Sequence, residues 1–309
     1  MLPKWIRGEV GQLRRDNRSG AADITLSAIK IVRNYLRSTT VQDKTEFLED
    51  LRELCGGLLF AQLAMSSVRN ACVDILSTLS EYRNGDSLEK VRRELDNKLA
   101  SLEQHISLAP KKIADRLVRV LPSRGRVLTL SYSSTVMGVL KELKRRGKRL
   151  EVVVMESRPM LEGRRTAQEL ARARIRTTLV ADAALGEYTR KVDAAVVGAD
   201  AVYGDGSVVN KVGTFPVAVS CHELLKPLFV VAHSSKITTE QAGSFTIEEK
   251  APGELMRGRY PRLTVRNFYF ELTPATYITA IVTEKGILSP RTMRKKSAWI
   301  GTSHHKHEV

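Results

Sequence analysis

The sequence predicts an α/β protein: a helical N-terminal domain, residues 1–122, followed by a second domain, residues 123–309, with a mostly parallel sheet. Residues 1–122 carry apolar side chains at three- and four-residue steps and show no strand-like alternation. After Pro122, short β-rich runs alternate with helical stretches, which is the pattern of a parallel sheet covered by helices on both faces. The length of 309 residues fits two domains of ~150 residues each.

The helices of the first domain follow from their apolar spacing. Residues 22–36 place apolar side chains at helical intervals. Residues 87–106 are highly charged and keep one apolar stripe, so we expect an exposed amphipathic helix there. Pro110 is expected to open a further helix that runs to about Leu121. Two more helices are expected over residues 45–54 and 65–79.

The second domain is expected to contain five strands. Ligands of such sheets usually bind at the carboxyl ends of the strands, so the residues that follow the strands are the candidates for function. Helices are expected over residues 135–146 and 163–174, with a short one near Leu185, and Gly147 is placed to end the first of them. The strands are expected over residues 126–130, 150–155, 177–180, 194–197 and 228–232.

The charge of the chain is concentrated in its second half. Lys and Arg number 50 against 34 Asp and Glu, a net charge of +16. Residues 1–122 hold 20 basic and 16 acidic side chains, a net +4, and residues 123–309 hold 30 and 18, a net +12. This excess favours an anionic ligand or partner in the second domain.

Several classes of protein are excluded by composition. No stretch approaches the ~18 consecutive apolar residues that a membrane helix needs. The first ten residues are charged and polar too early for a signal peptide. The cysteines, Cys55, Cys72 and Cys221, are odd in number and lack metal-ligand spacing, so we expect a reducing, cytoplasmic compartment and no metal site. No cofactor is expected.

Serines follow the first predicted strand. Ser131, Ser133 and Ser134 lie in the strand-to-helix turn, and Ser133 or Ser134 can cap the next helix. The start of a helix offers free backbone N–H groups and a partial positive charge, which suits phosphate. A phosphate site and a plain helix cap both fit this segment.

The second strand leads into a loop that contains Glu156, Arg158 and Pro159. Proline fixes the chain here. Arg158 can clamp a phosphate with two hydrogen bonds, or it can form a structural ion pair with Glu156. The sequence leaves both alternatives open.

The fourth strand ends in the sharpest group of polar residues. Asp200 follows apolar residues 194–197, which sets its carboxylate in a cleft rather than in open solvent. Residues 204–206, Gly-Asp-Gly, predict a tight hairpin that returns the chain to Asn210 and Lys211. Lys236, after the fifth strand, can add a further positive charge. A purely structural role for Asp200 is the alternative.

These segments resemble a known superfamily. The resemblance is found in five segments that are spread over nearly the whole chain: RSGAA, the SYSS turn, ESRPMLEG, GADAVYGDGSVVNKVGT and FELTPATYITAIVTEKGIL. The superfamily joins the alpha, beta and delta regulatory subunits of translation initiation factor 2B to the isomerases of methylthioribose 1-phosphate and ribose 1,5-bisphosphate. The resemblance implies a Rossmann-like second domain and a homodimer or dimer-built oligomer.

The resemblance also implies roles for individual residues. Asp200 matches the Asp of the isomerases' catalytic acid/base pair, while Ser131 stands where those enzymes have a catalytic Cys. Gln62 replaces a phosphate-binding Arg, and Glu271 replaces an Asp. The positions that contact ligand in the family fall on Arg18, Gly20, Ser133, Ser134, Arg158, Asn210, Lys211 and Lys236.

The replacement of Cys by Ser131 matters chemically. Aldose-to-ketose conversion needs one group that takes a proton and one that gives it, with pKa values near neutrality. A thiol, with a reference pKa of about 8.5, can be tuned to thiolate, whereas an alcohol needs an adjacent base. No His stands beside Ser131 in the sequence.

Three hypotheses follow. The first is an initiation factor 2B-related protein that holds a phosphorylated sugar or nucleotide without efficient isomerisation. The second is an active aldose-1-phosphate isomerase in which Asp200 works with another partner or a water. The third is a subunit of a translation complex whose basic face contacts RNA or an acidic protein. Basic runs such as residues 141–148 and 291–296 are more often solvated faces than RNA sites, and aromatic residues, at 6%, are few for base stacking.

Overall fold

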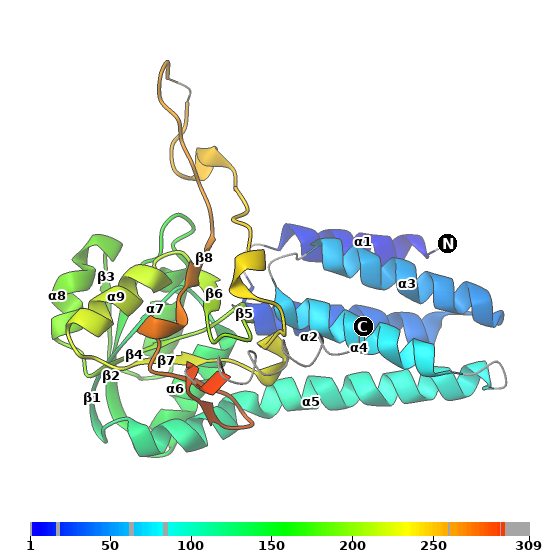
Figure 1. Ribbon diagram of the computed structural model, residues 1–309, viewed down its shortest axis with the longest axis horizontal. Helices are drawn as coiled ribbons and strands as arrows, with labels where there is room; N and C mark the ends of the chain where they lie inside the picture. Colours follow the sequence, from blue (N-terminus) through cyan, green and yellow to red (C-terminus); the bar gives the residue numbers. More distant parts are fainter. Residues whose placement is uncertain are drawn as a thin grey trace, which may run out of the picture. The chain divides into compact units, whose positions relative to one another are not determined.

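The computed structural model divides the chain into two compact units, residues 1–109 and residues 110–309 (Figure 1). Two positions that the sequence analysis singled out, Arg18 and Gln62, lie outside the described residues. In the part of the chain that the structure describes, no helix is both long enough and apolar enough to cross a membrane. The described residues are 2–16, 19–61, 65–82, 86–258, 260–290 and 292–293.

The N-terminal unit is helical, as predicted. Its core stacks Tyr35 on Phe47, with ring centroids 5.9 Å apart, and the Tyr35 hydroxyl donates to the carboxylate of Asp50. The first helix was not predicted, because Ile6 and Leu13 are its only buried residues. The helices are α1 (Lys4–Arg15), α2 (Ala21–Ser38), α3 (Lys44–Ala61), α4 (Ser66–Glu81) and the first part of α5 (Leu88–Val120).

A single helix, α5, replaces the two helices predicted on either side of Pro110. That prediction was wrong, since Pro110 lies inside the continuous helix. Tertiary packing explains the difference, because such contacts override local propensity. The Pro110 ring packs so closely on α6 (Ser134–Arg145) that a Cβ atom at Gly138 would lie 2.7 Å from Pro110 Cβ.

A seven-stranded sheet organises the second unit, in the order β10-β9-β7-β4-β1-β2-β3. All its neighbouring strands pair in parallel except β10, which is antiparallel to β9. The α/β fold and its mostly parallel sheet are therefore confirmed. The strands are β1 (Arg124–Leu130), β2 (Arg149–Met155), β3 (Thr177–Val180), β4 (Ala194–Val197), β7 (Leu228–Val231), β9 (Ala280–Val282) and β10 (Ile287–Leu288).

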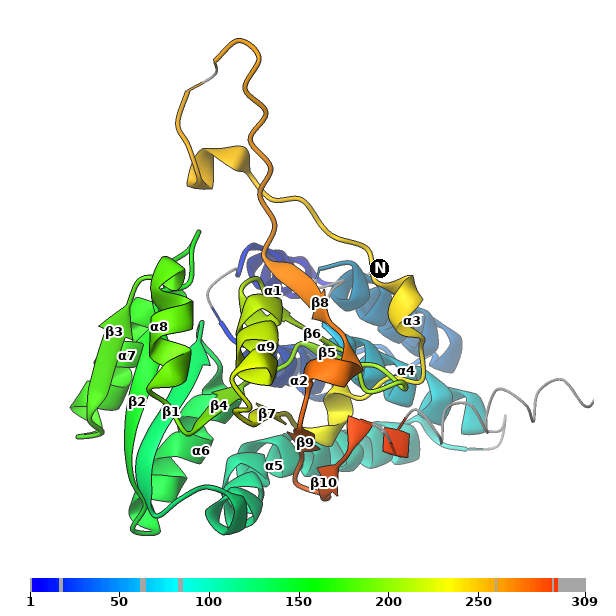
Figure 2. The ribbon, with the colours of Figure 1, turned by 60° about the vertical axis from the view of Figure 1, so that its left-hand side comes forward.

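Two pairs of helices pack with the sheet (Figure 2). One pair is α6 with α7 (Glu162–Arg172), and the other is α8 (Leu185–Arg190) with α9 (Thr214–Glu223). Right-handed crossovers in opposite directions along the sheet place the two pairs on opposite faces. Gly147, with φ of +85°, follows α6 as predicted, and Lys148 N–H returns to the Leu143 carbonyl at 3.0 Å.

A smaller sheet holds the predicted hairpin. It orders β5 (Ala201–Val202), β6 (Val208–Lys211) and β8 (Phe270–Thr273), all antiparallel. Gly206, with φ of +87°, closes the turn between the first two strands. The remaining short 3-10 helices are Asp182–Ala184, Ser234–Lys236, Ala242–Ser244, Pro252–Glu254 and Ala275–Tyr277.

An arm formed by the described residues 246–258 and 260–268 extends away from this sheet before β8 (Figures 1 and 2), whereas Ala242 and Phe245 still pack on the sheet. Its base is tied by Asn267, whose side chain donates to the Ala251 carbonyl at 2.9 Å and to Glu254 at 2.7 Å. The arm exposes the large apolar side chains of Ile247, Leu255, Met256, Tyr260 and Leu263.

Candidate functional site

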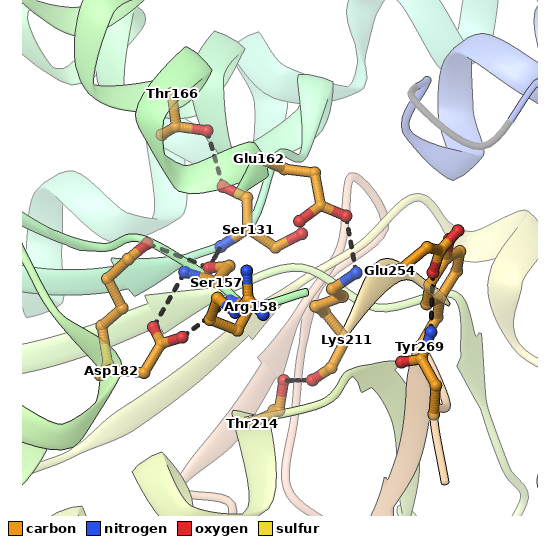
Figure 3. Close-up of polar contacts among 12 residues, drawn as sticks. Ser131, Ser157, Arg158, Glu162, Thr166, Asp182, Lys211, Thr214, Glu254 and Tyr269 are labelled. Atoms are coloured by element: carbon orange, nitrogen blue, oxygen red, sulfur yellow. Dashed lines mark hydrogen bonds and ion pairs between the residues drawn. The ribbon is translucent and has the colours of Figure 1, made fainter. Parts of the chain in front are cut away.

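Ser131, the residue after β1, has a left-handed backbone conformation, with φ of +58°. Its N–H donates to Ser157 Oγ at 2.7 Å, and its carbonyl accepts from Thr166 Oγ1 at 2.6 Å (Figure 3). Such a conformation is uncommon outside glycine and persists where the surroundings hold it. The backbone of Ser131 is therefore fixed, while its hydroxyl forms no hydrogen bond with any described residue.

The start of α6 forms one wall of the site. Ser133 Oγ accepts from Val136 N–H at 3.3 Å, so Ser133 is the helix cap. A Cβ atom at Gly198, after β4, would lie 2.8 Å from that oxygen, which explains the glycine. Ser134 Oγ is buried and has no hydrogen-bond partner among the described residues. A helix start with a spare buried hydroxyl is suited to an anionic oxygen.

The loop after β2 is held by Asp182, two residues beyond the end of β3. Its two carboxylate oxygens accept the N–H groups of Ser157 at 2.8 Å and Arg158 at 2.7 Å (Figure 3). Glu156 pairs instead with Arg164, at 3.0 Å, so the alternative of a Glu156–Arg158 ion pair was wrong. The Arg158 side chain is exposed. The loop thus fixes the backbone of Arg158 and leaves its guanidinium available for an anion.

Asp200 is buried at the end of β4. Its backbone N–H donates to the Val209 carbonyl at 2.8 Å, which joins the two sheets at this point. Burial raises the pKa of the Asp200 carboxyl above its ordinary value, while the charges of Lys236 and Lys211 act in the opposite direction. The Lys236 ammonium donates to the Ala199 carbonyl next to it. A buried carboxyl and two buried cations therefore share this edge of the sheet.

Lys211 spans the site from β6 to the first turn of α7. Its Nζ lies 2.6 Å from Glu162 Oε1, with side chains 5% and 14% exposed respectively (Figure 3). The same Nζ lies 4.4 Å from the centroid of the Tyr269 ring. Glu162 Oε2 is buried without a hydrogen-bond partner in the described part of the chain. Beside Lys211, the Asn210 side chain donates to Thr214 Oγ1 at 3.0 Å.

The backbone N–H groups at the start of α9 already have an acceptor within the protein. Glu271 Oε1 accepts the N–H groups of Gly213 at 2.7 Å and Phe215 at 2.9 Å. Burial raises the pKa of the Glu271 carboxyl, and these backbone hydrogen bonds oppose that rise. Glu271 therefore takes the backbone N–H groups at the start of α9, whereas the start of α6 is suited to a ligand phosphate.

The turn that carries Lys236 is anchored from the neighbouring strand. Glu284, which follows β9, accepts from Ser234 N–H at 2.9 Å and from the Ser234 hydroxyl. His233 Nε2 lies 3.5 Å from the same carboxylate. Burial acts to raise the pKa of the Glu284 carboxyl, but the hydrogen bonds from Ser234 and the charge of His233 lower it below its ordinary value. This anchor positions Lys236 beside Asp200.

The sequence-predicted residues of the C-terminal unit lie after successive parallel strands or on β6. Gly20 belongs to the N-terminal unit, where it precedes α2 as the helix cap. Three contributors were missed: Ser157, Glu162 and Asp182. Asp182 follows the third strand by two residues, so the rule applied to the other strand ends would have found it. Among the described residues, no group of His, Cys, Asp and Glu can hold a metal ion.

Comparison with known proteins identifies the family. The model of the "Initiation factor 2 subunit family" matches residues 17–290. The chain belongs to this family. Its relatives include an eIF-2B subunit 2-like protein of Pyrococcus furiosus, 32% identical over 94% of this chain and 98% of the relative. Ribose 1,5-bisphosphate isomerase of Archaeoglobus fulgidus is 30% identical over 88% of this chain and 85% of that enzyme.

Solved structures of the family share the fold. A translation initiation factor eIF-2B from Pyrococcus horikoshii OT3 has a TM-score of 0.82 and 28% identity, covering 94% of this chain and 99% of that chain. The 5-methylthioribose 1-phosphate isomerase from the same organism has a TM-score of 0.76 and 24% identity, covering 96% and 88%. The family therefore includes relatives named as initiation factors and relatives named as sugar-phosphate isomerases.

Proposed function

We propose that this protein is an initiation factor 2B-related protein that binds a phosphorylated sugar or nucleotide and does not isomerise it efficiently. The observation that carries the proposal is the hydrogen bonding of the Ser131 side chain. Its hydroxyl has no hydrogen-bonding base among the described residues, and an alcohol is a weak acid/base group without one. The rest of the site keeps the groups that hold an anion.

Three features of the site support binding. The start of α6 and the exposed Arg158 guanidinium offer donors for phosphate oxygens. Lys211 and Lys236 supply two buried positive charges beside Asp200. The spare buried oxygens of Ser134 and Glu162 provide partners for sugar hydroxyls, since buried polar atoms normally have a partner. In this arrangement Asp200 and Asn210 orient the sugar and the cations hold its phosphate.

Inefficient isomerisation follows from the same geometry. Moving hydrogen between C1 and C2 of a sugar requires an acid and a base, both in reach of the substrate. Asp200, with its raised pKa, supplies one of them. Ser131 stands at the position of the second, and its hydroxyl cannot be tuned to an anion near neutral pH as a thiol can.

An active isomerase of ribose 1,5-bisphosphate or methylthioribose 1-phosphate type is the second candidate. Asp200 favours it, because a buried carboxyl with a raised pKa beside cations is suited to proton transfer. In that case a water or another side chain replaces Ser131. Relatives named as isomerases of both substrates support this candidate.

We expect the protein to act as a homodimer or a dimer-built oligomer. The arm of residues 246–258 and 260–268 supports this expectation, because it exposes five large apolar side chains along one segment. Sedimentation of the purified chain at several concentrations tests the expectation. A single monomeric species throughout would contradict it.

Binding is tested by calorimetric titration of the full chain with ribose 1,5-bisphosphate, methylthioribose 1-phosphate and AMP, one at a time. We expect at least one of them to bind, and Lys211→Gln to weaken that binding by at least about tenfold. Lys250→Gln is the matched control, since Lys250 lies 5.4 Å from the centroid of the same Tyr269 ring but pairs with Glu248. Absence of binding to all three, or equal losses in both variants, would contradict the proposal.

A further inference from the structure

A cavity opens at the amino edge of the seven-stranded sheet, at the far end of β1 and β2 from Ser131. Its volume of about 700 Å³ lies within the range of small-molecule sites. Its walls come from the starts of β1 and β2, the last turn of α6 and the segment before β3. The basic side chains that line it are Arg124, Arg126, Lys144, Lys148, Arg149, Arg174 and Arg176, against one acidic side chain, Glu151.

The sheet itself brings two of these charges together. Arg124 on β1 and Arg149 on β2 are register partners in the parallel pair, so both side chains leave the same face on adjacent strands. Like charges directly opposite each other destabilise a sheet. Two residues further along, the next pair on this face is Arg126 with Glu151, which form an ion pair at 3.1 Å. The first pair has no such compensation.

Some of the basic side chains have structural partners. Lys144 Nζ donates to the carbonyls of Ala173 at 2.7 Å and Arg174 at 2.6 Å, at the end of α7. Lys148 Nζ donates to the Leu121 carbonyl, and Arg176 lies 3.9 Å from Glu151. These contacts tie the walls together.

Three of the guanidinium groups that line the cavity have no structural partner among the described residues. Within the described residues, the side chains of Arg124, Arg149 and Arg174 form no ion pair and no hydrogen bond. Positive charge at the ends of α6 and α7 is ordinary, because it offsets the helix dipole. The helix dipole does not account for Arg124 and Arg149, which belong to strands.

We propose that this cavity binds a compact polyanion of the polyphosphate class, a small molecule with several negative charges on linked phosphate groups. Guanidinium groups match phosphate oxygens with two hydrogen bonds each, and a shared anion would relieve the repulsion between Arg124 and Arg149. A single-stranded RNA is disfavoured, because the lining contains no aromatic side chain on which a base could stack.

The test is a calorimetric titration of the full chain with inorganic tripolyphosphate, orthophosphate and single-stranded RNA at fixed ionic strength. We expect tripolyphosphate to bind at least about tenfold more tightly than orthophosphate, because more oxygens meet guanidinium groups. The triple variant Arg124→Gln/Arg149→Gln/Arg174→Gln is expected to lose at least about tenfold in affinity for tripolyphosphate. These residues are exposed, so the variant is expected to fold, and a melting curve verifies this.

Two control variants distinguish binding in this cavity from binding elsewhere on the protein. Lys30→Gln/Arg52→Gln/Arg93→Gln removes the same charge from exposed positions of the N-terminal unit and should leave the affinity unchanged. Lys211→Gln tests whether the anion occupies the site at the carboxyl edge instead, and it should also bind tripolyphosphate normally. The proposal is overturned by equal losses in both triple variants, by a loss only in Lys211→Gln, or by RNA binding without tripolyphosphate binding.

Discussion

Lys211 and Glu162 form a buried ion pair across the carboxyl edge of the sheet, with Nζ 2.6 Å from Oε1. The pair connects β6 to the first turn of α7 and lies beside the turn that holds Ser131. A ligand phosphate that recruits Lys211 has to compete with Glu162 for the same ammonium. The pair therefore positions Lys211 in the free protein and sets how strongly an anion must bind to engage it.

Removing one partner of this pair should destabilise the fold. We expect Lys211→Met to lose about 3 kcal/mol of unfolding free energy, because Glu162 is left as a buried charge without its partner. The double variant Lys211→Met/Glu162→Gln should recover most of that loss but not ligand binding. Denaturant unfolding measures the stabilities. A double variant no more stable than Lys211→Met alone would show that the pair has no such energetic role.

The loop that carries Arg158 should depend on Asp182. We expect Asp182→Ala to lose about 1–3 kcal/mol of stability and to weaken ligand binding, because two backbone N–H groups lose their acceptor. Asp193→Ala is the control, since Asp193 accepts one backbone N–H, that of Arg126, at the opposite edge of the sheet. It should lose stability without losing affinity for a sugar phosphate. Unchanged affinity in Asp182→Ala would separate this loop from ligand binding.

Gly198, which follows β4, should be required because a larger residue would displace the Ser133 side chain that caps α6. In Gly198→Ala the new methyl group would meet Ser133 Oγ at 2.8 Å and force it away from Val136 N–H. We expect a loss of about 0.5–2 kcal/mol, the cost of a missing cap. Gly186→Ala, in α8 with open space around its Cβ position, should gain up to about 1 kcal/mol. Thermal melts compare the stabilities of the two variants. An equal change in both would show that the proposed clash does not occur.

Glu271 should make stability depend on pH in a defined direction. Its pKa is raised in the folded protein, so the folded state holds a proton that the unfolded state releases. Its contribution is thus greatest below the ordinary value of 4.5 and is lost as pH rises through the raised pKa. Glu271→Gln keeps an oxygen that can accept from both Gly213 and Phe215. This variant should gain stability relative to the wild type as pH rises.

A shorter replacement provides the control for that pH dependence. Glu271→Ala also removes the acceptor, so it should be about 1–2 kcal/mol less stable than Glu271→Gln at every pH. Urea unfolding between acidic and neutral pH measures both variants. A constant difference between Glu271→Gln and the wild type would contradict the raised pKa.

The sequence predicted five strands of the parallel sheet, because central strands such as β4 and β7 are fully buried and therefore apolar throughout, and it missed β9 and β10. A short, continuous apolar run such as residues 194–197 is typical of a strand that is covered on both faces. The same regularity placed Ser131, Arg158 and Asp200 at one edge, since parallel strands end there together. Periodicity predicts positions of this kind without knowledge of any side-chain contact.

Side-chain partners could not be predicted in this way. The partner of Glu156 is Arg164, one of several arginines within reach along the chain, and only the turn into α7 selects it. Pro110 lies inside α5 because of a close approach to Gly138 from a different helix. Both outcomes depend on tertiary geometry, which local spacing does not encode.

The central claim, a sugar-phosphate site with little isomerase activity, is tested by phosphorus NMR of the purified protein with ribose 1,5-bisphosphate and methylthioribose 1-phosphate. We expect shifts or broadening of the substrate signals without ketose-phosphate product in the wild type. Product should appear in Ser131→Cys and disappear again in Ser131→Cys/Asp200→Asn, because the thiol restores the missing acid/base partner. Rapid product formation by the wild type would contradict the account and establish the protein as an isomerase that works without a cysteine.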